Sequence, residues 1–131
     1  MTATTRVDAA IDEVTAQVYQ IPTDAPEADG TLAWSSTTLV LAEVSAGGLR
    51  GIGYTYGDGA AAKLITGPLA GTLTGHDAVD IPARWESMVK AMRNNGRPGL
   101  VSCAISAVDT ALWDLKGKLL GLPVCRLLGM A

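Results

Sequence analysis

Residues 101–120 read VSCAISAVDTALWDLKGKLL, and this stretch decides the class of fold. Its apolar residues recur at intervals of three and four, the spacing of one helix face; they are Val101, Ala104, Ile105, Val108, Leu112, Leu115 and Leu119. Gly121 and Pro123 follow, and both residues are typical of the end of a helix. The pattern therefore predicts a long helix whose apolar stripe faces a core.

Two further helices are predicted immediately upstream, over Ala60–Leu73 and Asp80–Met92. Gly67-Pro68 should divide or kink the first helix, because proline removes a backbone donor. Asp80 is placed to cap the second helix, and Pro82 suits its first turn. Residues 60–121 thus read as helical.

The first part of the chain is typical of strands, at Val7–Gln20, Thr37–Val44 and Leu49–Tyr56. In the last of these, large residues alternate with Gly51, Gly53 and Thr55, which is the period of a pleated strand. We therefore predict an α+β fold, a three-stranded antiparallel meander followed by a helical bundle. Strands should occupy about residues 7–56 and helices about 60–121, with a tail at 122–131, in one domain over residues 1–131.

Composition excludes several classes of function. The chain has 131 residues, of which 48% are hydrophobic, enough for one core, and its net charge of −3 gives no footprint for nucleic acid. Its longest uncharged stretches have 13 residues, short of the roughly 20 that a membrane-spanning helix needs. Because the amino terminus lacks the features of a secretory signal, we expect a cytoplasmic location and no membrane partner. Cys103 and Cys125 are predicted to be buried or partly buried free thiols.

The 15 residues Pro22–Ser36 are predicted to form a loop, and long loops are often functional. Its acids, Asp24 among them, do not match a calcium-binding loop and favour a solvated surface. Trp34 either covers a ligand or anchors the loop to the core. A second corner, Gly57-Asp58-Gly59, follows Tyr56, which either faces a ligand or packs at the strand end.

The carboxy-terminal helix carries a longer motif: Ala104–Lys118 reads AISAVDTALWDLKGK, followed by LLGLPV and, at Leu127–Gly129, LLG. It closely resembles the first signature of the mandelate racemase and muconate lactonizing enzyme group in the enolase superfamily. The resemblance covers essentially the whole chain, as the N-terminal capping domain of that group. Asp114 can pair with Lys118 one turn on, and Gly117 suggests a tight crossing. A helix-embedded acid such as Asp109 is commonly paired with a basic group, and the resemblance makes it structural.

The resemblance implies that the chemistry belongs to a C-terminal (β/α)8 barrel that is missing from this chain. Family members abstract the proton next to a substrate carboxylate with a lysine or histidine base, while magnesium held by three acids stabilises the enediolate. We therefore expect no catalytic residue, no metal ligand and no cofactor in this chain, with magnesium bound by the barrel. A full barrel needs about 250 residues.

In complete relatives, the loops after the first and third strands close over the barrel mouth and help to choose the substrate. By position these loops are Thr23–Trp34 and Tyr56–Gly59, so the substrate-proximal candidates are Asp24, Trp34, Tyr56 and Asp58. The expected partners are the barrel of the same protein, a carboxylate small molecule and further copies in a homo-oligomer. The expected reaction is sugar-acid dehydration or racemisation, with cycloisomerisation open. The alternative is a free-standing noncatalytic interaction or ligand-binding module.

Overall fold

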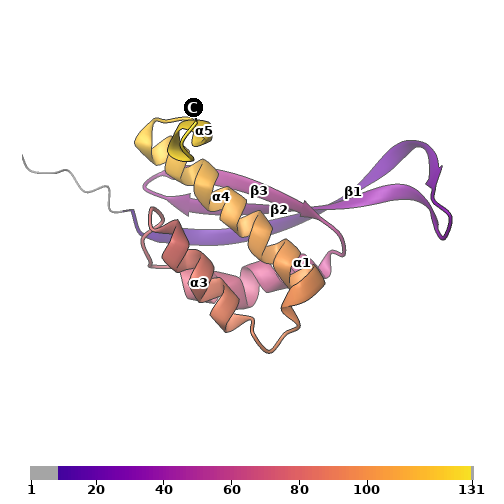
Figure 1. Cartoon of the computed structure of the whole chain (residues 1–131), viewed down its shortest axis with the longest axis horizontal. Helices are drawn as coiled ribbons and strands as arrows, with labels where there is room; N and C mark the ends of the chain where they lie inside the picture. The colour runs from indigo at the N-terminus through magenta and orange to yellow at the C-terminus, as the bar shows by residue number, and fades with distance from the viewer. Residues whose placement is uncertain (1–8, 131) are drawn as a thin grey trace, which may run out of the picture.

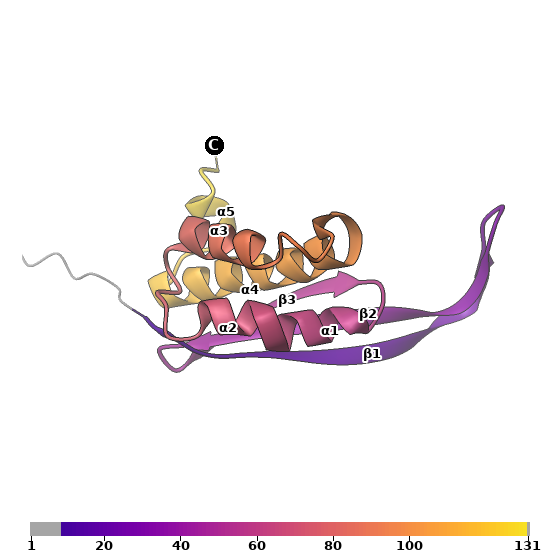
Figure 2. The same ribbon diagram turned by 90° about the horizontal axis from the view of Figure 1, so that it is seen from below.

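The chain folds into two layers, a sheet and a set of helices that covers one face of it (Figures 1 and 2). The structure is a computed structural model that describes residues 9–130. Its antiparallel sheet has the order β1 (Ile11–Ala28), β2 (Ala33–Ala46), β3 (Leu49–Tyr56). The predicted α+β meander followed by helices is confirmed. The predicted start of the first strand at Val7 lies outside the described residues.

The helices follow the strands in the order expected, and the first of them is interrupted where proline occurs. Pro68 lies inside a π-helical segment, η1, that joins two short α-helices. Asp80 caps the next helix, because its side chain accepts a hydrogen bond from the Ala83 nitrogen at 3.4 Å. The elements are α1 (Ala60–Leu64), η1 (Ile65–Leu69), α2 (Ala70–Leu73), α3 (Ile81–Ala91), η2 (Arg97–Val101), α4 (Ser102–Leu120) and α5 (Val124–Leu127).

The long helix α4 lies directly against strand β3, and glycine makes this approach possible. A Cβ atom at Gly51 would come within 2.1 Å of the Ala111 carbonyl oxygen, and one at Gly53 within 2.1 Å of the Ala107 oxygen. The two glycines therefore face the helix, and the large residues that alternate with them, Ile52 and Tyr54, point away from it. Gly117 is also tightly surrounded, since a Cβ there would lie 2.9 Å from the Leu122 oxygen, but its neighbour is the chain turning back after α4 and not a crossing element.

The core lies between the sheet and the helices, as the apolar stripe of α4 predicts. Val40, Ala42 and Val44 of β2 are fully buried. Leu112 and Leu115 of α4 meet them from the helical layer and are also fully buried. The cysteines are free thiols as expected, but Cys125 is exposed, not buried, because the short helix α5 lies at the surface.

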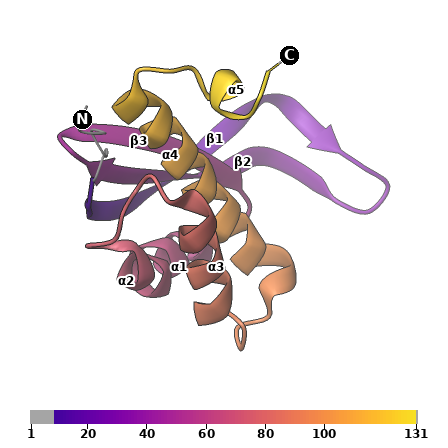
Figure 3. The ribbon, with the colours of Figure 1, turned by 60° about the vertical axis from the view of Figure 1, so that its left-hand side comes forward.

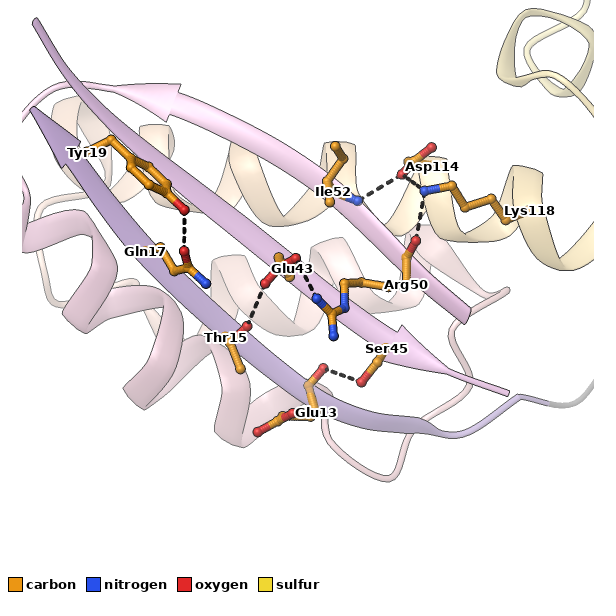
Figure 4. A network of polar contacts seen from close by, with 10 residues as sticks. All are labelled: Glu13, Thr15, Gln17, Tyr19, Glu43, Ser45, Arg50, Ile52, Asp114 and Lys118. Atoms are coloured by element: carbon orange, nitrogen blue, oxygen red, sulfur yellow. Dashed lines mark hydrogen bonds and ion pairs between the residues drawn. The ribbon is translucent and has the colours of Figure 1, made fainter. Parts of the chain in front are cut away.

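An ion pair on α4 binds the outer edge of β3. Asp114 pairs with Lys118 at 2.7 Å, as predicted, and its Oδ2 also accepts a hydrogen bond from the Ile52 nitrogen at 2.8 Å (Figure 4). The Lys118 ammonium donates to the Arg50 carbonyl oxygen at 2.8 Å. Together the two side chains satisfy backbone groups on either side of Gly51 that a neighbouring strand would otherwise bind. The clamp thus closes this part of the sheet edge.

The prediction of a 15-residue loop at Pro22–Ser36 is wrong. β1 and β2 continue past the helical body as a paired ribbon that projects from it, with a turn only at residues 29–32 (Figures 1 and 3). The pairing is irregular, because Pro22 faces Ser36 and the next pair is Glu27 with Trp34, so residues 23–26 bulge opposite Ser35. The two prolines and the acids indicated a loop, but this bulge accommodates them within a hairpin.

Candidate functional site

Two of the predicted substrate-proximal residues, Trp34 and Tyr56, lie at one cleft. The cleft has a volume of about 310 Å³ and lies where β3 ends and β2 continues into the projecting hairpin. Leu39 and Tyr56 form the last β2–β3 pair. The residues that line the cleft are Trp34, Ser36, Thr37, Thr38, Tyr56 and Gly57.

The edge of β2 is open along this cleft. The Gly57 nitrogen donates to the Thr38 carbonyl oxygen at 3.3 Å, so the backbone groups of Thr38 point toward β3. Alternate residues of a strand direct their backbone groups to the same side, so those of Ser36 and Trp34 point into the region beyond the end of β3. Within residues 9–130, no strand pairs with β2 there. The cleft therefore combines backbone donors and acceptors with hydroxyl groups.

Trp34 is held by the hairpin itself. Its Nε1 donates a hydrogen bond to Glu27 Oε2 of the facing strand at 2.8 Å. The indole is partly buried, but it does not belong to the hydrophobic core or to the residues packed against it. The hydrogen bond fixes the ring as one wall of the cleft and uses the indole's single polar group.

The other candidates occupy different positions. Tyr56 is the last residue of β3 and is 69% exposed, so its ring and hydroxyl are accessible. Asp58 instead stabilises the start of α1, where its Oδ1 accepts from the Ala60 nitrogen at 2.7 Å. Asp24 is exposed within the bulge of β1 and does not line the cleft. The structure therefore brings together Trp34 and Tyr56, and leaves Asp24 and Asp58 outside the cleft lining.

The hydroxyl residues of the cleft were not predicted. Ser36, Thr37 and Thr38 directly follow Trp34 in sequence, so a run of hydroxyl side chains was the available signal. The prediction of a loop at residues 22–36 hid this signal, because the side chains of a loop have no regular alternation that would place them on one surface. The strand pairing places them beside Tyr56.

One acidic residue of the hairpin, Asp29, stabilises its turn. Asp29 Oδ1 accepts hydrogen bonds from the Thr31 nitrogen at 2.7 Å and the Leu32 nitrogen at 2.8 Å. The backbone hydrogen bond from Thr31, with smaller contributions from its hydroxyl and from Leu32, lowers the pKa of Asp29. Over residues 9–130, no three His, Cys, Asp or Glu side chains converge on a point where a metal ion could bind.

A second cavity, of about 200 Å³, lies between α3 and α4 and contains Asp109. Burial raises the pKa of this carboxyl. The expected basic partner is not observed among the ion pairs of the described residues. Arg97 also lines the cavity, but its guanidinium carbon lies over the Trp85 ring, 5.9 Å from the centroid.

The fold and the cleft define a class of protein: a two-layer α+β domain with a projecting hairpin whose base is lined by hydroxyl and aromatic side chains. The chain belongs to the mandelate racemase / muconate lactonizing enzyme family, whose N-terminal domain matches residues 11–129. The family resemblance and the predicted fold are thereby confirmed.

Similar proteins of known structure or activity support this membership. A mandelate racemase/muconate lactonizing enzyme-like protein from Rubrobacter xylanophilus is 49% identical, with a TM-score of 0.87 over 90% of this chain and 33% of its own. The 3,6-anhydro-alpha-L-galactonate cycloisomerase of Streptomyces coelicolor is 38% identical over 91% of this chain and 35% of its own. The L-talarate/galactarate dehydratase of Salmonella typhimurium is 35% identical over 72% of this chain and 25% of its own.

This chain spans about a quarter to a third of the length of the curated relatives that it matches. A structure of the Salmonella dehydratase holds magnesium and L-lyxarohydroxamate, and covers 98% of this chain with a TM-score of 0.79. No helix within residues 9–130 has the length and apolar character needed to cross a membrane.

Proposed function

We propose that this chain is the capping and substrate-specificity domain of an enolase-superfamily enzyme that removes the proton next to a substrate carboxylate. The observation that carries the proposal is the cleft at the end of β3, which Trp34 and Tyr56 both line although 22 positions separate them in sequence. The hairpin and the corner at residues 56–59 then close over the mouth of a C-terminal barrel. Closure of this kind excludes water and selects the substrate.

The lining of the cleft favours a sugar acid as substrate. Ser36, Thr37 and Thr38 provide hydroxyl groups that both donate and accept hydrogen bonds, and Tyr56 adds a fourth hydroxyl. The indole of Trp34 presents an apolar face, against which the carbon-bound hydrogens of a sugar chain can pack. Relatives named as sugar-acid dehydratases and as a cycloisomerase share this domain, which supports dehydration or cycloisomerisation over other outcomes.

Magnesium and the catalytic base are assigned to the barrel. The acids of the described residues lie apart, and those of the hairpin turn and of α1 already accept backbone hydrogen bonds. When bound in the barrel, magnesium would stabilise the enediolate that forms after proton removal. The role of this chain is to orient the hydroxyl-bearing end of the substrate and to shield the reaction from water.

A chimera tests the proposal. Residues 11–129 would replace the corresponding N-terminal domain of the Salmonella dehydratase, and turnover of a panel of sugar acids would be measured with and without magnesium. We expect magnesium-dependent turnover in which Trp34→Ala raises KM by about tenfold, because the truncation removes one wall of the cleft. Changing Ser36 and Thr38 together to alanine should alter which sugar acids the chimera prefers, because it removes two hydroxyl groups from the cleft.

Trp85→Ala provides the matched control. Trp85 is also a partly exposed tryptophan, but it lies on α3 at the other cavity. We expect its replacement to leave KM unchanged. A folded, active chimera in which Trp34→Ala and Trp85→Ala have equal KM values would contradict the assignment of the cleft to the substrate.

A further inference from the structure

The cleft at the end of β3 is lined by uncharged side chains. They are an indole, a phenol and three aliphatic hydroxyls, and Gly57 adds backbone only. Among the described residues, the basic residues closest in sequence to the corner at 56–59 are Arg50 and Lys63. Arg50 lies at the other end of β3, where it pairs with Glu43 at 3.0 Å, and Lys63 lies on α1 and is not part of the lining. Within residues 9–130, no basic side chain lines the cleft.

The charges beside the cleft are negative. Glu27 Oε2 accepts the hydrogen bond from Trp34 Nε1 at 2.8 Å, so its carboxylate lies next to one wall. Asp58 directly follows Gly57, and its Oδ1 binds the start of α1. Neither carboxylate belongs to an ion pair among residues 9–130. Both therefore disfavour a further negative charge in the cleft.

Gln20 of the facing strand sets the direction of two hydroxyl groups in the cleft. Its Nε2 donates to Ser36 Oγ at 2.8 Å, which leaves the hydroxyl hydrogen of Ser36 available as a donor. Its Oε1 accepts from the Thr38 hydroxyl at 3.4 Å, which leaves the oxygen of Thr38 available as an acceptor. The two neighbouring hydroxyls thus present one donor and one acceptor.

The open edge of β2 repeats this combination. Ser36 directs both its N–H and its carbonyl group into the cleft, and no strand within residues 9–130 pairs with them. A sugar hydroxyl both donates and accepts, so it can satisfy every one of these groups. A carboxylate only accepts, so it would leave the Ser36 carbonyl and the Thr38 oxygen unpaired and would bring its own unpaired charge out of water.

We propose that the cleft selects the uncharged, hydroxyl-bearing end of a monocarboxylate sugar acid, and that it disfavours sugar acids with a carboxylate at each end. This inference deepens the proposed function and rests on it. The reacting carboxylate belongs to the barrel with its magnesium, and the opposite end of the substrate lies against this domain. The second carboxylate of a diacid would meet Glu27 and Asp58 with no cation in the lining to pair with it.

The chimera with the barrel of the Salmonella dehydratase tests the inference. Its turnover of galactarate is compared with that of the two enantiomers of galactonate, which differ from galactarate only in carrying a hydroxyl group in place of one carboxylate. Relative to the unmodified dehydratase, the ratio of kcat/KM for galactonate to that for galactarate should rise by about tenfold or more. Thr38→Lys should reverse the rise, because it places a cation in the cleft. Ser106→Lys is the control, since Ser106 also carries a hydroxyl but lines the cavity between α3 and α4.

An active chimera whose ratio does not rise overturns the inference, and so does one in which Ser106→Lys acts as strongly as Thr38→Lys. A folded but inactive chimera contradicts the proposed function alone. Calorimetric titration with magnesium then compares the two acids directly, and tighter binding of galactonate is expected. Equal binding, or binding of neither acid, overturns the inference.

If circular dichroism shows that the chimera is unfolded, nuclear magnetic resonance of the 131-residue chain replaces it. At equal concentration, galactonate should shift the amide signals of residues 36–38 more than galactarate does. Equal shifts, or no shift with either acid, overturn the inference.

Discussion

The two ends of β1 and β2 behave as different structures although they belong to the same strands. At one end, Val40, Ala42 and Val44 are fully buried beneath α4. At the other, the same two strands leave the helical layer and form a projecting hairpin, where Trp34 bonds only across the pair (Figure 3). The core end has tertiary packing, and the hairpin end depends on backbone pairing and a few side-chain bonds.

The difference shows how one sheet can provide both a scaffold and a binding surface. Packing against helices buries the inward side chains of the core end, so those residues cannot contact a ligand. Backbone pairing alone leaves the side chains of the hairpin end free, and hydroxyl and aromatic residues occur there. Tertiary packing therefore decreases along the strands as accessibility increases.

The largest expected effect comes from removing core volume. Leu112→Ala should lower the free energy of unfolding by about 2–5 kcal/mol, because its side chain is fully buried between the layers. The matched change in the hairpin is Leu32→Ala, which should alter stability by less than about 0.5 kcal/mol since Leu32 is 66% exposed. Chemical denaturation measures both. Equal losses would show that the hairpin is as tightly packed as the core.

A smaller effect is expected from adding volume where α4 meets β3. Gly53→Ala should destabilise the chain by about 1–3 kcal/mol, because the new methyl group would clash with the Ala107 carbonyl and separate the layers. Gly30→Ala in the hairpin turn is the control, since nothing lies within 4 Å of its added Cβ. A denaturation midpoint unchanged by Gly53→Ala would argue against the close approach of helix and strand.

The clamp on β3 should give an effect of intermediate size that depends on pH. Burial works against ionisation of Asp114, but the hydrogen bonds from Lys118 and Ile52 outweigh it and lower its pKa. Asp114→Ala should cost about 1 kcal/mol at neutral pH, allowing for solvent screening. Because the pKa is lowered on folding, this contribution is present above the ordinary value of 3.8 and is lost as the pH falls through the lowered pKa.

Urea denaturation at neutral and acidic pH measures this dependence. Glu86→Ala is the control, because Glu86 also pairs with a lysine four residues on but binds no strand. Its effect should be much smaller. A cost of Asp114→Ala that persists unchanged in strong acid would mean that the clamp does not depend on the carboxylate charge.

The smallest expected effect on global stability is at the hairpin. Trp34→Phe removes the bond to Glu27 but keeps an aromatic ring, so the free energy of unfolding should change by less than about 0.5 kcal/mol. Hydrogen exchange should nevertheless be faster at residues 27–34 in the variant, while residues 40–46 keep their protection. Trp85→Phe serves as the control. Equal protection of both segments in both proteins would remove the distinction between the two ends.

Local patterns of the sequence predicted the elements that have strong periodicity or clear end signals. The alternation at Leu49–Tyr56 gave the bounds of β3, and Asp80 marked the start of α3. The family motif in α4 was sufficient to assign the domain. The hairpin was missed because its two strands are stabilised by each other, and its prolines, acids and glycine are each typical of loops.

The sequence by itself determined the helical stretches between residues 60 and 121, the order of the strands, the pairing of Asp114 with Lys118 and the family, but it predicted a tail where α5 lies. Each of these depends on residues that are close along the chain or on a contiguous motif. Only the tertiary structure decided that Gly51 and Gly53 face the helix, that β2 is open beyond Tyr56, and that Trp34 and Tyr56 share a cleft. The physical reason is that these features depend on strand register and on the approach of distant segments, which no local periodicity encodes.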